Sequence, residues 1–536
     1  MEIEDRDDYN TFYFDKDKPI TNKTFKILKN YNKIIFCNEF NQPVINIPSS
    51  IKYISFGKYF NQSVDNLPTN LKSLTFGFDF DQSVDNLPSE LETLVLAQSF
   101  NQPVENLPSG LNKLVFGSEF NQPINNLPHK LKTLKLDHSF NQPVDNLPLE
   151  LEHITFSYGF YQTIDNLPQS LKSITTGWLF NKPINNLPAN LQHLNLGYHF
   201  NQPVDNLPNG IQTIRFTNKF NQKVDNLPTE LQMITFSAEF NQTVDNLPSK
   251  LIFISFGHRF NQPLNNLPSS LISLELGNNF NLKVDNLPSG LQTLIFGNSF
   301  NQQVDNLPSG LQTLIFGNNF NQSVDNLPFG LISLTFGYYF NQPVNNLSTS
   351  LQNISFGDKF NQTVDNLPIN LKQLTFGDNF NQPVNNLPNR IETLNFGEKF
   401  NQSVEKLPIN LEQLTFGDDF NQSVDKLPSC ISSIIFGYDF NQPVDNLSAS
   451  IKNITFGEEF NHPVDNLPPN LKNITFGNKF DNSIDNLPAS VKNITLGYEF
   501  NQTVDNLPVG LQNITFGYGY NKPLHKLPPY MRVSKK

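Results

Sequence analysis

A block of 20 residues repeats along nearly the whole chain, and this period limits the possible folds more than any other feature. Phenylalanine occupies every twentieth position from Phe40 to Phe500, and Tyr520 continues the series. The interval from 40 to 520, divided by 20, gives 24 full repeats without an insertion or deletion. A length of 536 residues would otherwise suggest several globular domains. An internal repeat takes precedence over that expectation and predicts one array of stacked blocks.

Each repeat follows the pattern F-N-Q-P-V-D-N-L-P-x-x-L-x-x-L-x-F-G-x-x. In residues 280–299, Leu294 and Phe296 are two residues apart and therefore point to one side of a short strand. Position 295, which is often Thr or Ser in other repeats, then faces solvent. Six apolar residues of this repeat are expected in the interior: Phe280, Val284, Leu287, Leu291, Leu294 and Phe296.

Proline indicates where the strand cannot be. It recurs after Leu in the full repeats and is replaced only by Ser348 and Ser448. A proline in every layer would remove a ladder hydrogen bond from every layer, so this segment is a turn or extended coil. Twenty residues per turn also leave no room for an α-helix. We therefore predict an all-β or β-rich solenoid, right-handed by the usual crossover rule, with one short parallel strand per turn.

Two polar columns are expected from the same periodicity. The Asn after each Phe, as in Asn281 and Asn301, is expected to form a buried amide column that satisfies backbone groups of the bends. The acid after Val, as in Asp65 and Asp85, is expected to accept hydrogen bonds within its own turn. The alternative is a cation-binding rail, which we disfavour because Asn125 and its equivalents replace the acid freely.

The repeat also defines the expected boundaries. Residues 1–26 are polar and out of register, and they are expected to form an N-terminal tail and cap. Residues 27–530 form the solenoid, and residues 531–536 a basic, solvated C-terminal tail.

The pattern resembles the FNIP repeat, a short relative of the leucine-rich repeat found mainly in slime moulds and in giant viruses of amoebae. The residues that carry the resemblance are Phe40-Asn41-Gln42-Pro43 and Phe120-Asn121-Gln122-Pro123, together with L-x-x-L-x-F, and it covers about residues 27 to 530. The resemblance implies a leucine-rich-repeat-like solenoid that binds proteins and has no active site. Family members often carry an F-box, but residues 1–26 are too short for one.

Charge and cysteine content exclude several classes of partner. The net charge of −12 argues against nucleic acid, which requires a basic surface. Cys37 and Cys430 are too far apart in a linear array to form a disulfide, which favours a reducing compartment. The acidic N-terminus is unlike a signal peptide, and no segment is apolar enough to span a membrane. We expect a soluble, intracellular monomer, located in the host cytoplasm if the source is a virus.

The sequence predicts neither catalysis nor a cofactor. No nucleophile and base pair, phosphate loop or paired cysteine motif stands out from the periodic background. Six histidines crowd one half of the chain but occupy different repeat positions, so they are not expected to converge on a metal. They are His129, His138, His153, His193, His199 and His258.

One column departs from the background. His138, Tyr158, Trp178 and Tyr198 occupy the same position in four consecutive repeats and should form a continuous aromatic strip. Exposed aromatic residues are favoured at protein interfaces, so this strip is the candidate protein-binding site. In the same region Tyr161 replaces the Asn of the column and Thr176 replaces a core Phe. The alternative is that Trp178 and its neighbours cover a locally underpacked core.

Three functional hypotheses follow. The first is a non-enzymatic protein-interaction scaffold that binds a protein and no small-molecule substrate. The second is a structural spacer, or a product of repeat expansion, because residues 284–298 and 304–318 are nearly identical. The third, from the resemblance, is a substrate adaptor that has lost its F-box.

Overall fold

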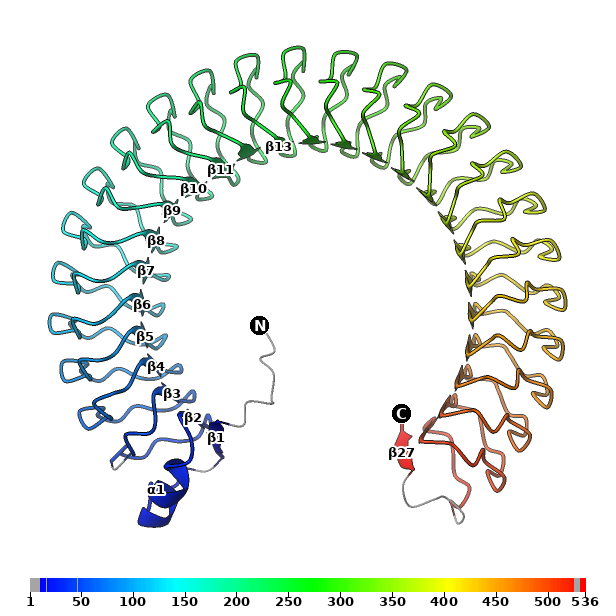
Figure 1. The fold of residues 1–536 in the computed structure, drawn as a ribbon, viewed down its shortest axis with the longest axis horizontal. Coiled ribbons are helices and arrows are strands. Elements are labelled where there is room, and N and C mark those ends of the chain that lie inside the picture. The colour runs from blue at the N-terminus through cyan, green and yellow to red at the C-terminus, as the bar shows by residue number, and fades with distance from the viewer. Residues whose placement is uncertain (1–9, 16, 46, 525–530) are drawn as a thin grey trace. The chain divides into compact units, whose positions relative to one another are not determined.

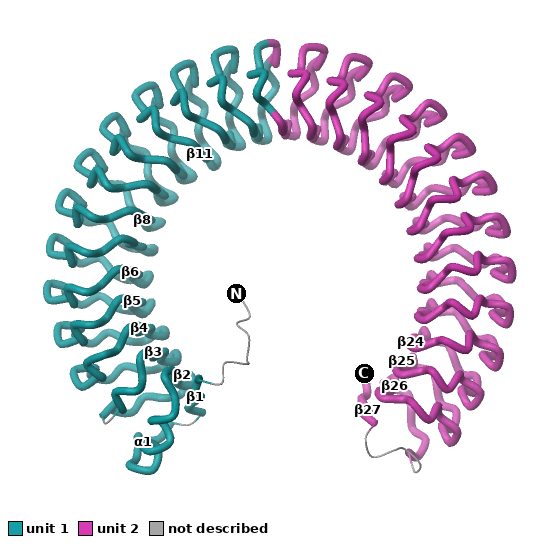
Figure 2. Tube along the Cα trace, viewed as in Figure 1, with its two compact units in different colours: residues 1–262, 266–271 teal, residues 263–265, 272–536 magenta. Residues whose placement is uncertain are grey.

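The computed structural model describes residues 10–15, 17–45, 47–524 and 531–536. The chain divides into two compact units (Figure 2). Unit 1 contains residues 1–262 and 266–271, and unit 2 contains residues 263–265 and 272–536. Both units consist of short parallel strands joined by turns and bends (Figure 1).

Unit 1 contains the following elements: β1 (Thr11–Phe14), α1 (Asn22–Leu28), β2 (Lys33–Phe36), β3 (Tyr53–Ser55), β4 (Ser73–Thr75), β5 (Thr93–Val95), β6 (Lys113–Val115), β7 (Thr133–Lys135), β8 (His153–Thr155), β9 (Ser173–Thr175), β10 (His193–Leu196), β11 (Thr213–Phe216), β12 (Met233–Thr235) and β13 (Phe253–Ser255). Each strand pairs in parallel with the next.

Unit 2 contains strands only among its described residues: β14 (Ser273–Glu275), β15 (Thr293–Ile295), β16 (Thr313–Ile315), β17 (Ser333–Thr335), β18 (Asn353–Ser355), β19 (Gln373–Thr375), β20 (Thr393–Asn395), β21 (Gln413–Thr415), β22 (Ser433–Ile435), β23 (Asn453–Thr455), β24 (Asn473–Thr475), β25 (Asn493–Thr495), β26 (Asn513–Phe516) and β27 (Arg532–Lys535). Their pairing is again parallel and sequential.

The strand register reproduces the sequence period. Leu294 pairs with Leu314, its equivalent in the following repeat, and Ile34 pairs with Ile54 in the same way. The predicted parallel β-solenoid with one short strand per 20-residue turn is therefore confirmed. The single helix of the described residues, α1, precedes the first regular turn.

Both ends of the chain add a strand that the repeat does not predict. In β1, Thr11 pairs with Lys33, and in β27, Arg532 pairs with Asn513. These strands lie in the segments that were expected to be an N-terminal tail and a solvated C-terminal tail. The side chains of β27 are exposed, but its backbone extends the ladder of unit 2. Both strands form on the otherwise unpaired edge of the adjacent strand, which local composition does not reveal.

Aromatic columns fill the interior. Phe300 is fully buried and stacks between Phe280 and Phe320, with ring centroids 6.2 and 6.1 Å away. A second column contains Phe296 and Phe316, 5.5 Å apart. Of the six residues expected inside the repeat at 280–299, five are buried and Leu287 is half-buried at the rim. The proline after it, Pro288, is buried and was not predicted to contribute to the core.

The spacing of these columns explains why the strands line the concave side of each unit (Figure 1). Parallel strands repeat at ~4.8 Å. The rings of Phe316 and Phe336, which directly follow the strands, repeat at 5.7 Å, and those of Phe320 and Phe340 at 6.0 Å. Because the repeat distance grows with distance from the strands, successive turns spread apart on the other side.

Most turns carry a glycine after the second Phe, where the backbones of adjacent turns approach closely. Five turns carry another residue there: Ala97, Asp137, Ser157, Thr217 and Ser237. A Cβ atom on Gly317 would lie 2.1 Å from the carbonyl oxygen of Gly297, and Gly377 meets Gly357 in the same way at 2.3 Å. Real Cβ atoms do not come so close to an oxygen. The glycine therefore allows adjacent turns to pack directly after the strand.

The amide column is confirmed as a source of backbone hydrogen bonds, but its expected burial is wrong. The Oδ1 atom of Asn301 accepts from the backbone N–H of Asn321 at 2.9 Å and from Nε2 of Gln322 at 3.0 Å. Asn301 itself is half-buried and Asn281 is exposed. The bonded groups belong to the rim of the turn, where water reaches them.

The acidic column also differs from the prediction. Asp285 Oδ1 accepts from Nδ2 of Asn306 in the following turn at 3.2 Å. A bond within the turn occurs where Ser lies two residues before the acid, as between Ser63 Oγ and Asp65 Oδ2 at 2.6 Å. The column therefore links adjacent turns through Asn as well as supporting its own bend.

Candidate functional site

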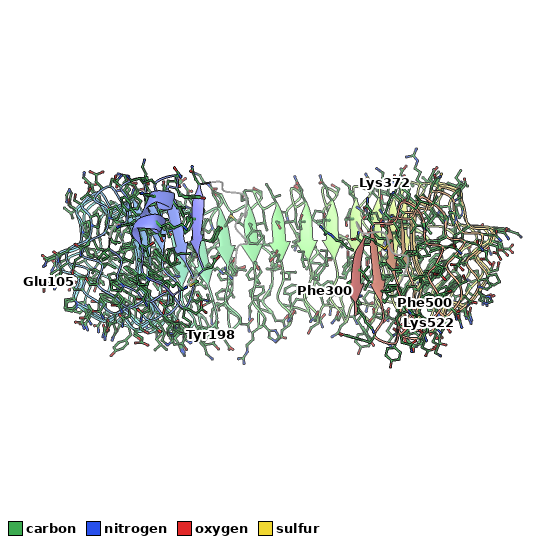
Figure 3. All side chains as sticks on the ribbon, turned by 90° about the horizontal axis from the view of Figure 1, so that it is seen from below. Glu105, Tyr198, Phe300, Lys372, Phe500 and Lys522 are labelled. Atoms are coloured by element: carbon green, nitrogen blue, oxygen red, sulfur yellow. The ribbon has the colours of Figure 1, made fainter. Side chains whose placement is uncertain are left out.

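The candidate site is the aromatic strip, which we define as His138, Tyr158, Trp178 and Tyr198. Each residue lies in the turn that follows its strand, directly after the repeat position that most turns fill with glycine. The carbonyl oxygen of Tyr158 accepts from the backbone N–H of Leu179 at 3.0 Å, and that of Trp178 accepts from His199 at 2.9 Å. These bonds hold consecutive bends in register, so side chains at this position must stack. Figure 3 shows Tyr198 on the side of its unit where the strands end.

The four rings form one continuous stack. The centroids of His138 and Tyr158 are 4.8 Å apart, those of Tyr158 and Trp178 5.4 Å, and those of Trp178 and Tyr198 3.9 Å. The planes of neighbouring rings differ by 17°, 17° and 6°. The sequence prediction of a continuous strip is therefore confirmed in its geometry.

The strip is open to solvent at its edges. Tyr158 is 44% exposed and Trp178 is 40% exposed, whereas His138 is exposed and Tyr198 half-buried. Because the neighbours of Trp178 cover both faces of its indole, solvent meets ring edges. Ring edges carry partial positive charge, and the Tyr hydroxyls and the indole N–H can donate hydrogen bonds. This arrangement suits apolar groups and oxygen acceptors better than cations or sugars, which require free ring faces.

Two further residues extend the surface and were not assigned to it from the sequence. His199 contacts Tyr198 edge-on at 5.1 Å and Trp178 at 6.5 Å. Leu179 is 41% exposed beside them. Each of them directly follows a strip residue in the chain. Two adjacent apolar or aromatic residues in one turn were therefore the sequence signal for this larger surface.

The template breaks near the strip have separate local explanations. Thr176 is buried, and its Oγ1 accepts from the backbone N–H of Gly197 at 2.8 Å, so a hydrogen bond replaces the lost aromatic contact. Tyr161 is 52% exposed, and its backbone N–H donates to Asn141 Oδ1 at 3.1 Å, but its side chain has no amide oxygen to accept a hydrogen bond from the next turn. The ring contacts of Trp178 join it to Tyr158, Tyr198 and His199, which are all surface residues.

The other candidate groups do not converge. Within the described part of the chain, no three His, Cys, Asp or Glu residues are arranged to hold a metal ion. His193 Nδ1 lies 2.9 Å from Thr213 Oγ1, so this histidine forms a hydrogen bond with the neighbouring turn. Cys37 is a half-buried free thiol and Cys430 an exposed one. Among the described helices, none has the length and apolar character needed to cross a membrane.

Comparison with known proteins gives a consistent result. The sequence profile of the family described as "FNIP Repeat" matches residues 40–79, 100–139, 120–159, 160–199, 180–219, 240–279, 260–299, 279–319, 300–339, 363–399, 400–439, 440–479, 460–499 and 480–518. A search of curated protein sequences gave no match.

Three solved structures illustrate the structural likeness. The giant-virus protein CroV588, described as "a novel circular LRR protein structure", is 36% identical with a TM-score of 0.86, and the alignment covers 98% of this chain and 91% of CroV588. YopM from Yersinia enterocolitica is 16% identical with a TM-score of 0.39, over 95% and 93% of the two chains. The mouse RP105/MD-1 complex is 13% identical with a TM-score of 0.41, and the alignment covers 94% of this chain and 85% of the other. The last two scores are too low to support an argument.

Proposed function

The chain belongs to the FNIP-repeat family, a leucine-rich-repeat-like group of solenoids, and from this premise we propose that it is a non-enzymatic protein-interaction scaffold that binds a partner at the aromatic strip. Repeat solenoids of this kind offer extended surfaces and are typically not enzymes. The observation that carries the proposal is the run of four stacked, edge-exposed rings, since interfaces concentrate their binding energy in exposed aromatic residues.

The edge-on geometry defines the chemistry of the partner. With both faces of the Trp178 indole covered, the strip offers apolar edges and hydrogen-bond donors. A protein surface with apolar side chains and free carbonyl oxygens matches this pattern. A nucleic acid does not, because the chain has a net charge of −12. We further propose that the scaffold acts as a monomer inside the cell, in the host cytoplasm if its source is a virus.

The proposal is tested by comparing variants as affinity baits in a lysate of the native host. Trp178→Ala should lose a co-purifying protein that the wild type retains, with binding weakened about 30-fold or more if Trp178 is a hot spot. Tyr438→Ala is the matched control, because Tyr438 holds the same repeat position and is 49% exposed but lies between Asp418 and Glu458.

The alternatives give different results. If Trp178 serves local packing, Trp178→Ala lowers the unfolding temperature and leaves partner capture unchanged. If the protein is a spacer without a fixed partner, removal of one whole repeat within residues 138–198 leaves every association intact. Either result would contradict the proposal.

A further inference from the structure

A groove in unit 2 carries an unneutralised column of lysines. Lys452 and Lys472 line a groove of about 590 Å³ together with Ser450, Asn470 and Ser490, and Glu412 lies at its other end. We call this the basic groove. Lys492 holds the same repeat position one turn further, and its Nζ donates to the carbonyl oxygen of Gly510 at 3.0 Å. All three lysines immediately precede a strand. Figure 3 shows the equivalent Lys372 on the side where the strands of this unit begin.

The same groove in unit 1 is neutralised, which provides a comparison within one chain. Lys132, Glu150, Glu152 and Lys172 line a groove of about 500 Å³, which we call the balanced groove. Glu152 bridges both lysines, at 3.3 Å to Lys132 and 2.6 Å to Lys172. Lys172 and then Lys132 lower the pKa of Glu152, as expected for a carboxylate between two ammonium groups.

The lysine columns beside the two grooves differ at one repeat position. Residues 152 and 472 occupy the same repeat position because their numbers differ by a multiple of 20, and so do Asn470 and Glu150. Lys-Glu-Lys at positions 132, 152 and 172 therefore corresponds to Lys-Lys-Lys at positions 452, 472 and 492. Lys452 and Lys472 line the basic groove, and Lys492 continues the column one turn beyond its lining. Among the ion pairs of the described residues, none involves Lys452, Lys472 or Lys492.

Stacking three like charges has a cost that a ligand would remove. The backbones that carry these lysines are one strand spacing, ~4.8 Å, apart, so their like charges repel one another. Glu412 is the acidic residue of the groove lining, and the residues that follow Lys472 and Lys492 in the chain, Asn473 and Asn493, are uncharged. Asn473 donates to Asn453 at 2.6 Å, and Asn493 donates to Asn473 at 2.5 Å, so each retains a second amide hydrogen.

We propose that the basic groove binds an extended acidic segment of a partner protein through its carboxylates. Alternate residues of an extended chain lie ~6.8 Å apart on one side, so two of their carboxylates fall within a column of lysines that spans about 10 Å. A third lies roughly 4 Å beyond its end, within reach of a long lysine side chain. A nucleic acid would bring many more phosphates close to a chain of net charge −12, which disfavours it. The small Ser and Asn side chains leave the groove accessible to a backbone.

The test is fluorescence polarisation with a labelled peptide of about eight residues that alternates Glu and Ser. Wild-type protein should bind it with an affinity that falls as salt rises, and a peptide with Gln in place of Glu should not bind. Lys472→Glu should weaken binding at least about tenfold, which corresponds to about 1.4 kcal/mol. This variant should fold, because it recreates the Lys-Glu-Lys arrangement of the balanced groove.

Two further variants separate the groove from net charge. Lys399→Glu changes the charge by the same amount at a different repeat position of unit 2 and should leave the affinity within about twofold. Glu152→Lys should create a second site in the balanced groove. Lack of binding by the wild type, equal loss in Lys399→Glu, or unchanged binding in Lys472→Glu would overturn the proposal. Tighter binding of a single-stranded oligonucleotide of equal charge, lost in the same variant, would overturn it in favour of nucleic acid.

Discussion

At the scale of single residues, the repeat varies freely where a side chain points outward and less where two backbones touch. The glycine column belongs to the second class, because the missing Cβ allows the carbonyl oxygen of the preceding turn to approach. Conformational freedom does not explain these glycines, since the close approach is steric. These glycines therefore differ from glycines elsewhere in the turn, such as Gly210, where an added Cβ would have more room.

Replacing Gly317 with Ala should destabilise the protein by about 1–3 kcal/mol, since the new Cβ would lie 2.1 Å from Gly297 O and the turns must separate. The matched control is Gly210→Ala, where the nearest atom would be 3.4 Å away. That variant should be neutral or slightly stabilising, because it reduces the entropy of the unfolded chain. Urea unfolding followed by circular dichroism measures both. Equal effects would show that steric contact is not the reason for the glycine.

A carboxylate of the acidic column provides a prediction on pH. The Ser63 hydroxyl and then the Asn86 amide lower the pKa of Asp65 below its ordinary value of 3.8. A lowered pKa means that the fold favours the ionised form, so this contribution to stability is present above the ordinary value. It is lost as the pH falls through the lowered pKa. The unfolding temperature of wild type should therefore exceed that of Asp65→Asn near pH 6, and the difference should shrink near pH 3. A difference that does not change with pH would contradict this reading.

At the scale of the element, each turn is determined by stacking on its neighbours, and this is why most of the fold could be predicted. Leu294, Phe296 and Phe300 recur at intervals that fit one short strand and a return path, and the strand register follows the same interval. The sequence-based prediction was wrong where the burial of a side chain depends on how far its backbone lies from the core of the turn. Asn281 follows a fully buried Phe280 directly but is itself exposed, because the chain leaves the core at that bond.

The sequence predicts that the rings of the candidate site stack, but it does not predict which part of each ring a partner can contact. The shared repeat position of Tyr158, Trp178 and Tyr198 predicts their stacking, but only the ring planes show that edges face solvent. The basic groove was not identified from the sequence, although Lys452, Lys472 and Lys492 recur at intervals of 20 residues. What the structure adds is that Glu152 forms ion pairs with lysines of the turns on both sides.

The stacking itself can be measured, because Trp178 is the one tryptophan of the chain. Tyr198→Ala removes the ring that lies 3.9 Å from the indole and exposes one of its faces. The rate at which acrylamide quenches tryptophan fluorescence should therefore increase in this variant. Tyr438→Ala, which removes a ring from the same repeat position in unit 2, should leave quenching unchanged. An unchanged rate in Tyr198→Ala would contradict the stacked arrangement.

At the scale of the whole molecule, the strict period means that stability is a sum of similar turns and of the contacts between adjacent turns. Within unit 2, residues 284–298 and 304–318 carry nearly the same sequence and form successive turns with the same strand register. Their Phe300 and Phe320 rings continue one column. A turn can therefore be removed without changing the kind of contact that its neighbours make, provided that the period is kept.

Deletion of residues 300–319 removes one complete period and joins Ser299 to Phe320 in phase. This variant should remain folded, with circular dichroism per residue unchanged and an unfolding temperature close to that of wild type. Deletion of residues 300–309 removes half a period, including Phe300, Val304 and Leu307, which are buried in the intact chain. The remaining half-turn cannot place its strand in register or fill its part of the core, so this smaller deletion should be far more destabilising.

Because unfolding of a long repeat array can lose cooperativity, limited proteolysis is the suitable second measurement. New cleavage should appear near the junction in the half-period variant and be absent from the full-period variant. If the two deletions had the same effect, the turns would not be the independent, stackable units that the architecture requires.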